Sequence, residues 1–386
     1  MSKFNHFYEN PFFILKASSS DNRQKIVQLA QDMSLDDNHE NCNKARSDLN
    51  SPRARIAAEI GWLLGEKTFD SVKDLIEKSI NNPFSLQASQ GNALDQANLM
   101  AAALQNISGG SVNKISKLIF QLGLAIDAIK ISDVVSSINN CRKESGFSDV
   151  ASSHVEEHLV ARKLLFKHIA RDAIDKMPSN MVVLAMTNLM KDAAEFVPKH
   201  KHPSLISWLV DIYEKEAAGF IEQQEKIMTL LATKVGQASI SYENKDNKDL
   251  HLLQGAVKKW QTVMDPIYIG SELSGIQKQY GMRTVIAINN AVIDMWNVKN
   301  MSVKWHCDEM MEMAQQLASR SPNMLETVNQ SKSNLNKAAA TFVRPNIFEW
   351  FLAKLFKLAV FLLVRGAALF VGILILAAIK AWLHRL

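Results

Sequence analysis

Residues 154–158, HVEEH, combine the side chains that bind zinc and activate water. His154 and His158 are one helical turn apart, so one face of a helix would present both, and Glu157 beside the second could act as a base. The alternative is a charged, solvent-exposed start of a helix that holds no metal. We favour this alternative, because such zinc enzymes carry their ligands on large folds with strands, and the sequence shows no run of strands. We therefore expect no cofactor and no enzymatic activity, and keep a zinc-dependent hydrolase as the remaining enzyme hypothesis.

Other sequences associated with catalysis are missing. The chain contains no G-x-x-x-x-G-K-[ST], G-x-G-x-x-G or G-x-S-x-G sequence, so nucleotide hydrolysis is not indicated. Cys42, Cys141 and Cys307 are far apart and odd in number, which is typical of thiols in a reducing compartment. Five basic residues and Glu349 give residues 347–386 a charge of +4, leaving only +1 of the total +5 for the first 346 residues. Nucleic-acid binding is not expected from a body so close to neutral.

Helical periodicity accounts for almost the whole chain before residue 344. Apolar residues recur every three or four positions, for example at Ile115, Leu118, Ile119 and Leu122, with polar residues between them. We predict long helices over 151–175, 204–235 and 276–297, a turn at Pro266, and an all-α fold made of a multi-helix bundle or solenoid.

The N-terminal residues carry a more specific pattern. A short apolar turn at 11–16 is followed by a helix that Asp21 is expected to cap, a polar loop over 35–40, a second helix, and a third helix that starts near Pro52. The sequences "FFILKAS" and "ARSDLNSPRARIAAEI", with Leu49, Pro52 and Arg55 at matching spacing, resemble the J-domain, the helical hairpin of co-chaperones. "AAEIGWLLG", "ANLMAAAL" and "WQTVMDPIYI" are similar to sequences in a group of bacterial proteins with J-like N-termini.

The resemblance implies a docking surface on the hairpin. The J-domain family stimulates the ATPase of a heat-shock chaperone through a His-Pro-Asp tripeptide in the hairpin loop, and this chain has Asn38-His39-Glu40 in that place. We therefore expect a degenerate J-like domain that binds a protein partner without stimulating a chaperone. The residues expected to contact that partner are Asn38, His39, Glu40, Arg46 and Arg55.

The composition of the C-terminal segment predicts a membrane anchor. Leu358 to Ile379 form a run of 22 residues with Arg365 as the single charge, and a helix of this length covers about 33 Å, enough for a hydrocarbon core of about 30 Å. The flanking bases Lys354, Lys357, Lys380 and Arg385 could pair with anionic lipid headgroups. Arg365 either extends toward the headgroups or contacts another membrane subunit or a second copy of the helix. A helix lying in the interface is the alternative to a spanning one.

These patterns predict four segments, and a function that follows from their order. We expect a J-like helical domain at 1–66, a helical bundle at 67–238, a second helical unit and stalk at 239–344, and the anchor at 345–386. The expected protein is an adaptor on a bacterial inner membrane, its N-terminal body in the cytoplasm, which recruits a cytosolic protein and would suit a stress or phage-defence system. A J-protein-like co-chaperone at the membrane is the alternative.

Overall fold

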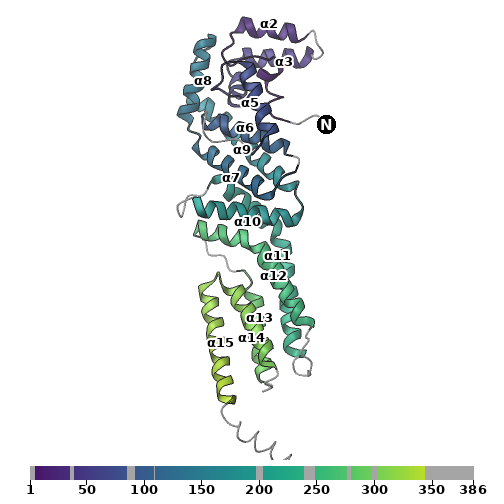
Figure 1. The fold of residues 1–386 in the computed structure, drawn as a ribbon. Coiled ribbons are helices and arrows are strands. Elements are labelled where there is room, and N and C mark those ends of the chain that lie inside the picture. The colour runs from purple at the N-terminus through teal and green to yellow at the C-terminus, as the bar shows by residue number, and fades with distance from the viewer. Residues whose placement is uncertain are drawn as a thin grey trace, which may run out of the picture. The chain divides into compact units, whose positions relative to one another are not determined.

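A computed structural model describes residues 5–34, 39–84, 92–107, 109–196, 203–238, 248–275, 280–297 and 303–343. Over these ranges the chain forms fifteen helices and no strand, which confirms the all-α prediction (Figure 1). The helices are α1 Pro11–Ile14, α2 Arg23–Met33, α3 His39–Asn50, α4 Ala54–Ile60, α5 Phe69–Asn81, α6 Ala93–Asn106, α7 Val112–Ala128, α8 Ile131–Ser145, α9 Ser152–Asp175, α10 Ser179–Phe196, α11 Ser204–Ala238, α12 Lys248–Ser274, α13 Met282–Asn297, α14 Lys304–Ala318 and α15 Pro322–Val343.

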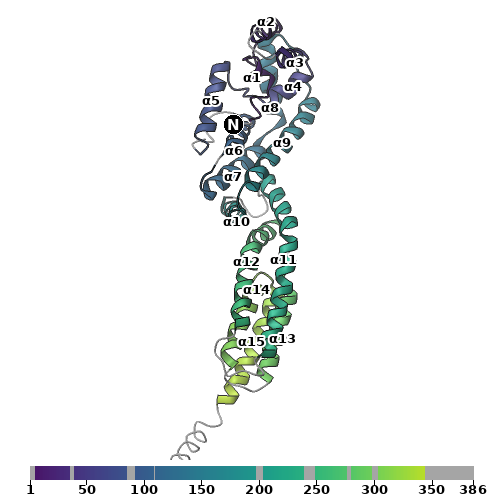
Figure 2. The same ribbon diagram turned by 90° about the vertical axis from the view of Figure 1, so that its right-hand side faces the viewer.

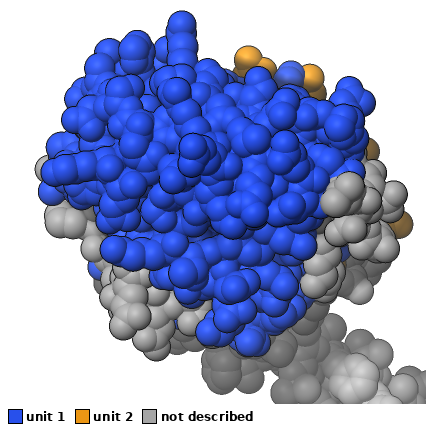
Figure 3. All heavy atoms as spheres, turned by 90° about the horizontal axis from the view of Figure 1, so that it is seen from above, with its two compact units in different colours: residues 1–225, 258–280 blue, residues 226–257, 281–386 orange. Residues whose placement is uncertain are grey.

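The chain divides into two compact units. Unit 1 comprises residues 1–225 and 258–280, and unit 2 comprises residues 226–257 and 281–386; Figure 3 colours unit 1 blue. Two of the three boundaries, at 225/226 and 257/258, fall inside helices α11 and α12, and neither unit is a single stretch of sequence. The sequence had suggested a boundary at residue 239, in a polar run whose residues 239–247 lie outside the described ranges.

The core of the N-terminal region is built from residues on both sides of the expected boundary at 66. Phe12, Leu49 and Trp62 are fully buried, and they share one hydrophobic cluster with Ile76 of α5 and Ala102 of α6. Helix α3 packs against α2, α1 and α4 (Figure 2). Residues 1–66 are thus completed by later helices rather than closed on themselves.

Buried polar side chains fasten the first helices to the rest of unit 1. The Asn10 side chain accepts a hydrogen bond from the Phe12 N–H at the start of α1, and its Nδ2 donates to the Ala58 carbonyl of α4 at 2.9 Å. From α6, Asn98 Nδ2 donates to the carbonyls of Ile60 and Trp62 at 3.0 Å each, just where α4 ends. Backbone N–H and C=O groups at helix ends, which have no partner within their helix, thus form hydrogen bonds with side chains.

Three local expectations need correction. The N-cap of α2 is Asn22, whose side chain accepts from Lys25 N–H, while Asp21 accepts from the Ser18 N–H instead. His39 and Glu40, which were placed in a loop, are the first residues of α3; a glutamate in a first turn is favoured by the helix dipole.

The third correction concerns Pro266, which lies inside the continuous helix α12 rather than in a turn. Proline lacks the N–H from which the Thr262 carbonyl would accept a hydrogen bond in a regular helix. One residue further, the Val263 carbonyl accepts a hydrogen bond from the Tyr213 hydroxyl of α11 at 2.9 Å. This contact supports the backbone of the turn before the proline.

Unit 2 is formed around α13, α14 and α15, which pack against one another, together with the adjoining parts of α11 and α12 (Figure 1). Met295, Met310 and Met311 are fully buried, and methionine fills irregular gaps well because its side chain is unbranched. The stretch 285–288, VIAI, whose β-branched residues also suit a strand, is helical within α13, as its periodicity favoured.

Among the helices of the described residues, none has the length and the apolar composition needed to cross a bilayer. The predicted span Leu358–Ile379 lies outside those residues. The same holds for Arg365 and for the basic residues Lys354, Lys357, Lys380 and Arg385.

His6 gives unit 1 a predicted dependence on pH. Its Nδ1 lies 2.8 Å from Gln105 Oε1, and burial together with the nearby charge of Arg162 lowers the pKa of His6 to about 3. In the unfolded chain the pKa is about 6.5, so as the pH falls below that value the unfolded state binds a proton first and the folded state loses stability.

The variant His6→Asn, which keeps a side-chain N–H for Gln105, should therefore lose less stability than the wild type between pH 6.5 and pH 4. Urea midpoints of the full chain in detergent at both pH values measure this difference. Equal losses in the two proteins would show that His6 does not contribute.

Candidate partner-binding groove

The residues predicted to contact a partner lie in different environments. His39 and Glu40 are exposed at the start of α3, Arg46 is half-buried on the same helix, and Asn38 lies outside the described residues. Arg55 is fully buried. The expectation that Arg55 contacts a partner is therefore wrong for this fold, because no part of its side chain reaches the surface.

Arg55 belongs to an ion network inside unit 1. Its Nε donates to Glu59 Oε1 at 2.8 Å, and Arg142 of α8 approaches the same carboxylate, with Nη2 2.8 Å from Oε2. Two arginines and one glutamate leave one uncompensated positive charge in the interior. Both arginines also donate to backbone carbonyls. Arg55 Nη2 lies 2.7 Å from the Ser19 carbonyl oxygen, and Arg142 Nη2 lies 2.9 Å from the Pro52 carbonyl oxygen.

Aromatic faces complete the network. The Arg55 guanidinium carbon lies 4.1 Å from the ring centroid of Phe147 and 5.1 Å from that of Phe12. A cation over an aromatic face is stabilised by the ring quadrupole, most strongly when water is excluded. The network therefore fixes α4 against α8 and has no free face for a ligand.

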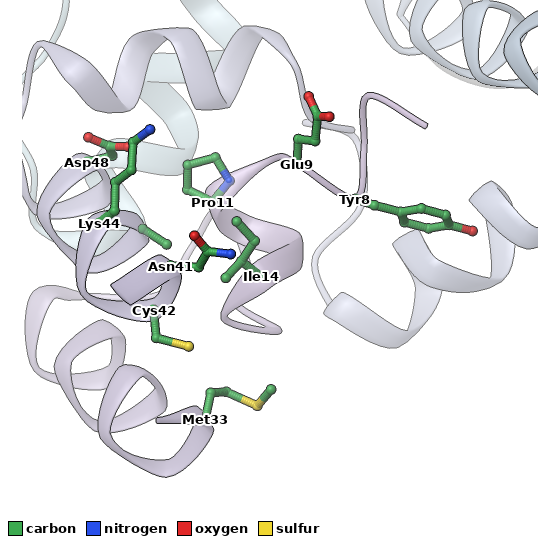
Figure 4. Close-up of a pocket in the computed structure, with 10 residues that line it drawn as sticks. Tyr8, Glu9, Pro11, Ile14, Met33, Asn41, Cys42, Lys44 and Asp48 are labelled. Carbon is green, nitrogen blue, oxygen red and sulfur yellow. The ribbon is translucent and has the colours of Figure 1, made fainter. Parts of the chain in front are cut away.

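An open groove lies on the surface between α1 and α3 (Figure 4). Its volume is about 710 Å³. The residues that line it are Tyr8, Glu9, Pro11, Ile14, Met33, Asn41, Cys42, Lys44, Ala45 and Asp48. The α3 residues among them recur at helical spacing, so a single face of that helix forms one wall.

The lining combines apolar and charged groups. Ile14 and Met33 are half-buried, and the lining residues Cys42 and Ala45 belong to the buried core. Lys44 and Asp48 lie near each other in Figure 4, and Glu9 lies on the α1 side. An apolar floor with charges along its edge is the kind of surface on which an amphipathic peptide binds. The charged groups sum to −1, which favours a segment with a basic residue.

A second groove lies elsewhere on unit 1, where α10, α11 and α12 meet the end of α9. It has a volume of about 800 Å³ and is lined mainly by apolar side chains, including Val182, Val183, Phe220 and Val263. Phe220 is 38% exposed, so this groove opens to solvent. Tyr213 and Val263, which form the hydrogen bond described above, both line this groove. Burial and the charge of Asp265 raise the pKa of the Tyr213 hydroxyl above its usual range.

The residues that suggested a metal site lie at the start of α9. His154 and Glu157 are exposed, and His158 is half-buried. No group of three or more histidine, cysteine or acidic side chains in the described part of the chain is arranged to hold a metal ion. A third ligand for His154 and His158 is thus missing from that part.

The groove residues Glu9, Lys44 and Asp48, and the network residues Glu59 and Arg142, were not singled out from the sequence. Asn41, Lys44, Ala45 and Asp48 follow the i, i+3, i+4, i+7 spacing of one helix face, which was a readable signal. Glu59 and Arg142 are 83 residues apart, and a single sequence offers no sign that they pair.

A scan against protein-family models gave no match, and searches of curated proteins and of solved structures likewise found no similar chain.

Proposed function

We propose that the protein is a membrane-anchored helical adaptor that binds a segment of a cytosolic protein in the α1–α3 groove. The observation that carries the proposal is the groove itself, with an apolar floor, charged edges and a volume of about 710 Å³. Charged edges fix the orientation of a bound peptide, and apolar contacts supply most of the binding free energy.

The proposed anchor is the segment 358–379, with its basic flanks, at the inner face of a bacterial membrane. Its support is the length and the apolar composition of the sequence. The adaptor would hold its partner close to that membrane. This role requires no cofactor and no catalytic residue.

Filling the groove tests the function. The variant Asn41→Trp adds a large side chain to an exposed lining position of α3, and it should reduce recovery of the partner from native membranes about tenfold, which corresponds to about 1.4 kcal/mol of binding free energy. Ser47→Trp, on an exposed position of α3 outside the groove, is the matched control and should leave recovery unchanged.

Quantitative mass spectrometry of the proteins that co-purify with each variant gives the comparison. Equal recovery with Asn41→Trp and wild type would contradict a role for the groove. Alkaline carbonate extraction of the same membranes tests the anchor, since release of the chain into the soluble fraction would count against a spanning helix.

The second candidate is a co-chaperone, favoured by the packing of the α2–α3 hairpin on α1 and α4. It predicts that the purified chain raises the ATPase rate of a heat-shock chaperone. An unchanged ATPase rate would contradict the co-chaperone function and would not bear on the adaptor function.

A further inference from the structure

Helices α11 and α13 approach each other closely in unit 2. A Cβ placed on Gly236 of α11 would lie 2.9 Å from the Ala291 Cβ of α13 and 3.0 Å from its Cα. Further along, the hydroxyls of Thr229 and Thr284 are 3.4 Å apart. Since small residues bring the two helices together, their outward sides form one continuous surface, which we call the α11–α13 face.

The α11–α13 face exposes large apolar side chains. On α13, Met282, Ile286 and Ile293 are 47%, 51% and 48% exposed, and their spacing of four and seven residues places them on one side of the helix. On α11, Ile227 and Leu230 are 37% and 56% exposed. Apolar side chains gathered on one face in this way commonly mark a protein interface.

A groove of about 460 Å³ runs between the two helices. Thr229, Thr233 and Gln237 line it from α11, and Arg283, Ile286, Ala287, Asn290, Ala291 and Asp294 line it from α13. The lining therefore mixes polar and apolar side chains, and the exposed Ile286 is one of them.

Two opposite charges lie toward the two ends of this groove. Arg283 and Asp294 are both exposed on α13, eleven residues and about 16 Å apart along the helix. Neither forms an ion pair with any other part of the chain that the structure describes. Eleven residues are close to three full turns, so both charges point to the same side.

This arrangement is complementary to itself. If two α13 helices lie antiparallel about a two-fold axis near residues 288 and 289, Arg283 of each copy faces Asp294 of the other. The same rotation brings the apolar side of each helix onto that of its partner. A two-fold interface requires this relation, because the same surface must serve on both sides.

We propose that the α11–α13 face is a self-association surface through which two copies of the chain pair, with their α13 helices antiparallel. Apolar contacts of Met282, Ile286 and Ile293 supply the binding free energy, and the two Arg283–Asp294 pairs set the register and the orientation. The inference does not depend on the adaptor function, and it concerns a different surface from the C-terminal segment.

Charge reversal tests the pairing directly, with the full-length chain in detergent micelles. In Arg283→Asp both intermolecular pairs become Asp–Asp, and in Asp294→Arg both become Arg–Arg. Each variant alone should bind itself at least about tenfold more weakly than the wild type does. An equal mixture of the two variants should associate again, because every pair in the mixed dimer is then Asp–Arg.

Sedimentation velocity of chains labelled with two different fluorophores measures self-association and mixed association separately. The double variant Arg283→Asp/Asp294→Arg should also dimerise, and Lys337→Asp, an exposed position of α15 in the same unit, is the control for a simple change of charge. A monomeric wild type, single variants as dimeric as the wild type, or a mixture that fails to associate would each overturn the proposal. Circular dichroism of every variant verifies that it is folded.

Discussion

Replacing Glu59 by glutamine should lower the free energy of unfolding of unit 1 by about 3–5 kcal/mol. The wild-type carboxylate accepts hydrogen bonds from both Arg55 and Arg142, and all three side chains are at most 1% exposed. Glutamine has nearly the same shape but no charge, so two buried guanidinium groups would face each other without a counter-ion. Removing one partner from a buried ion network leaves the desolvation cost of the others in place, which is why the effect exceeds that of a surface pair.

Urea unfolding of the full chain, followed by tryptophan fluorescence, measures the change. The control is Glu77→Gln, which breaks the exposed pair of Lys73 and Glu77 on α5, at 3.9 Å, and should cost less than about 1 kcal/mol. If Glu59→Gln and Glu77→Gln have the same effect, the buried network does not stabilise the fold in the way we describe.

The second large effect is expected at Gly236. In most helix interiors, glycine to alanine stabilises a protein by about 0.5–1 kcal/mol, because alanine loses less conformational entropy. At Gly236 the added methyl group would lie 3.0 Å from the Ala291 Cα, a backbone atom that cannot rotate away. Gly236→Ala should therefore destabilise unit 2 by about 1–3 kcal/mol, the usual cost of overpacking.

Gly255→Ala provides the matched comparison in the same unit. Gly255 is a helical glycine of α12, and a Cβ there would have no neighbour within 4 Å. Its substitution should raise the thermal midpoint, whereas Gly236→Ala should lower it. Two shifts of the same sign would mean that α11 and α13 can separate at little cost.

The sequence predicted the helices well because their signals are local. The apolar periodicity of α9, α11 and α13 extends over several turns, so it predicted their type and most of their length. Pro266 misled the prediction, because the stabilising contact comes from Tyr213, 50 residues away from Val263. Local propensity predicts a break there, and tertiary contacts override it.

The candidate site was only partly predictable for a related reason. The J-like pattern drew attention to the N-terminal hairpin, where the α1–α3 groove lies, but it assigned Arg55 to the surface. The position of Arg55 in the helical pattern does not show whether its side chain is exposed or buried. Burial depends on whether Glu59 and Phe147 come together around it. Long-range pairings of this kind appear only when the packing of the helices is known.

The division of unit 1 into two stretches of sequence affects the order in which the protein can be assembled during synthesis. Domains generally begin to fold from the N-terminus as the chain leaves the ribosome. Here residues 1–225 must wait for residues 258–280, which are made only after the first stretch of unit 2. The α1–α3 groove can form before that, because its lining ends at Asp48 and the core cluster beneath it ends at Phe147. A nascent chain would thus present the proposed binding surface before unit 1 is complete.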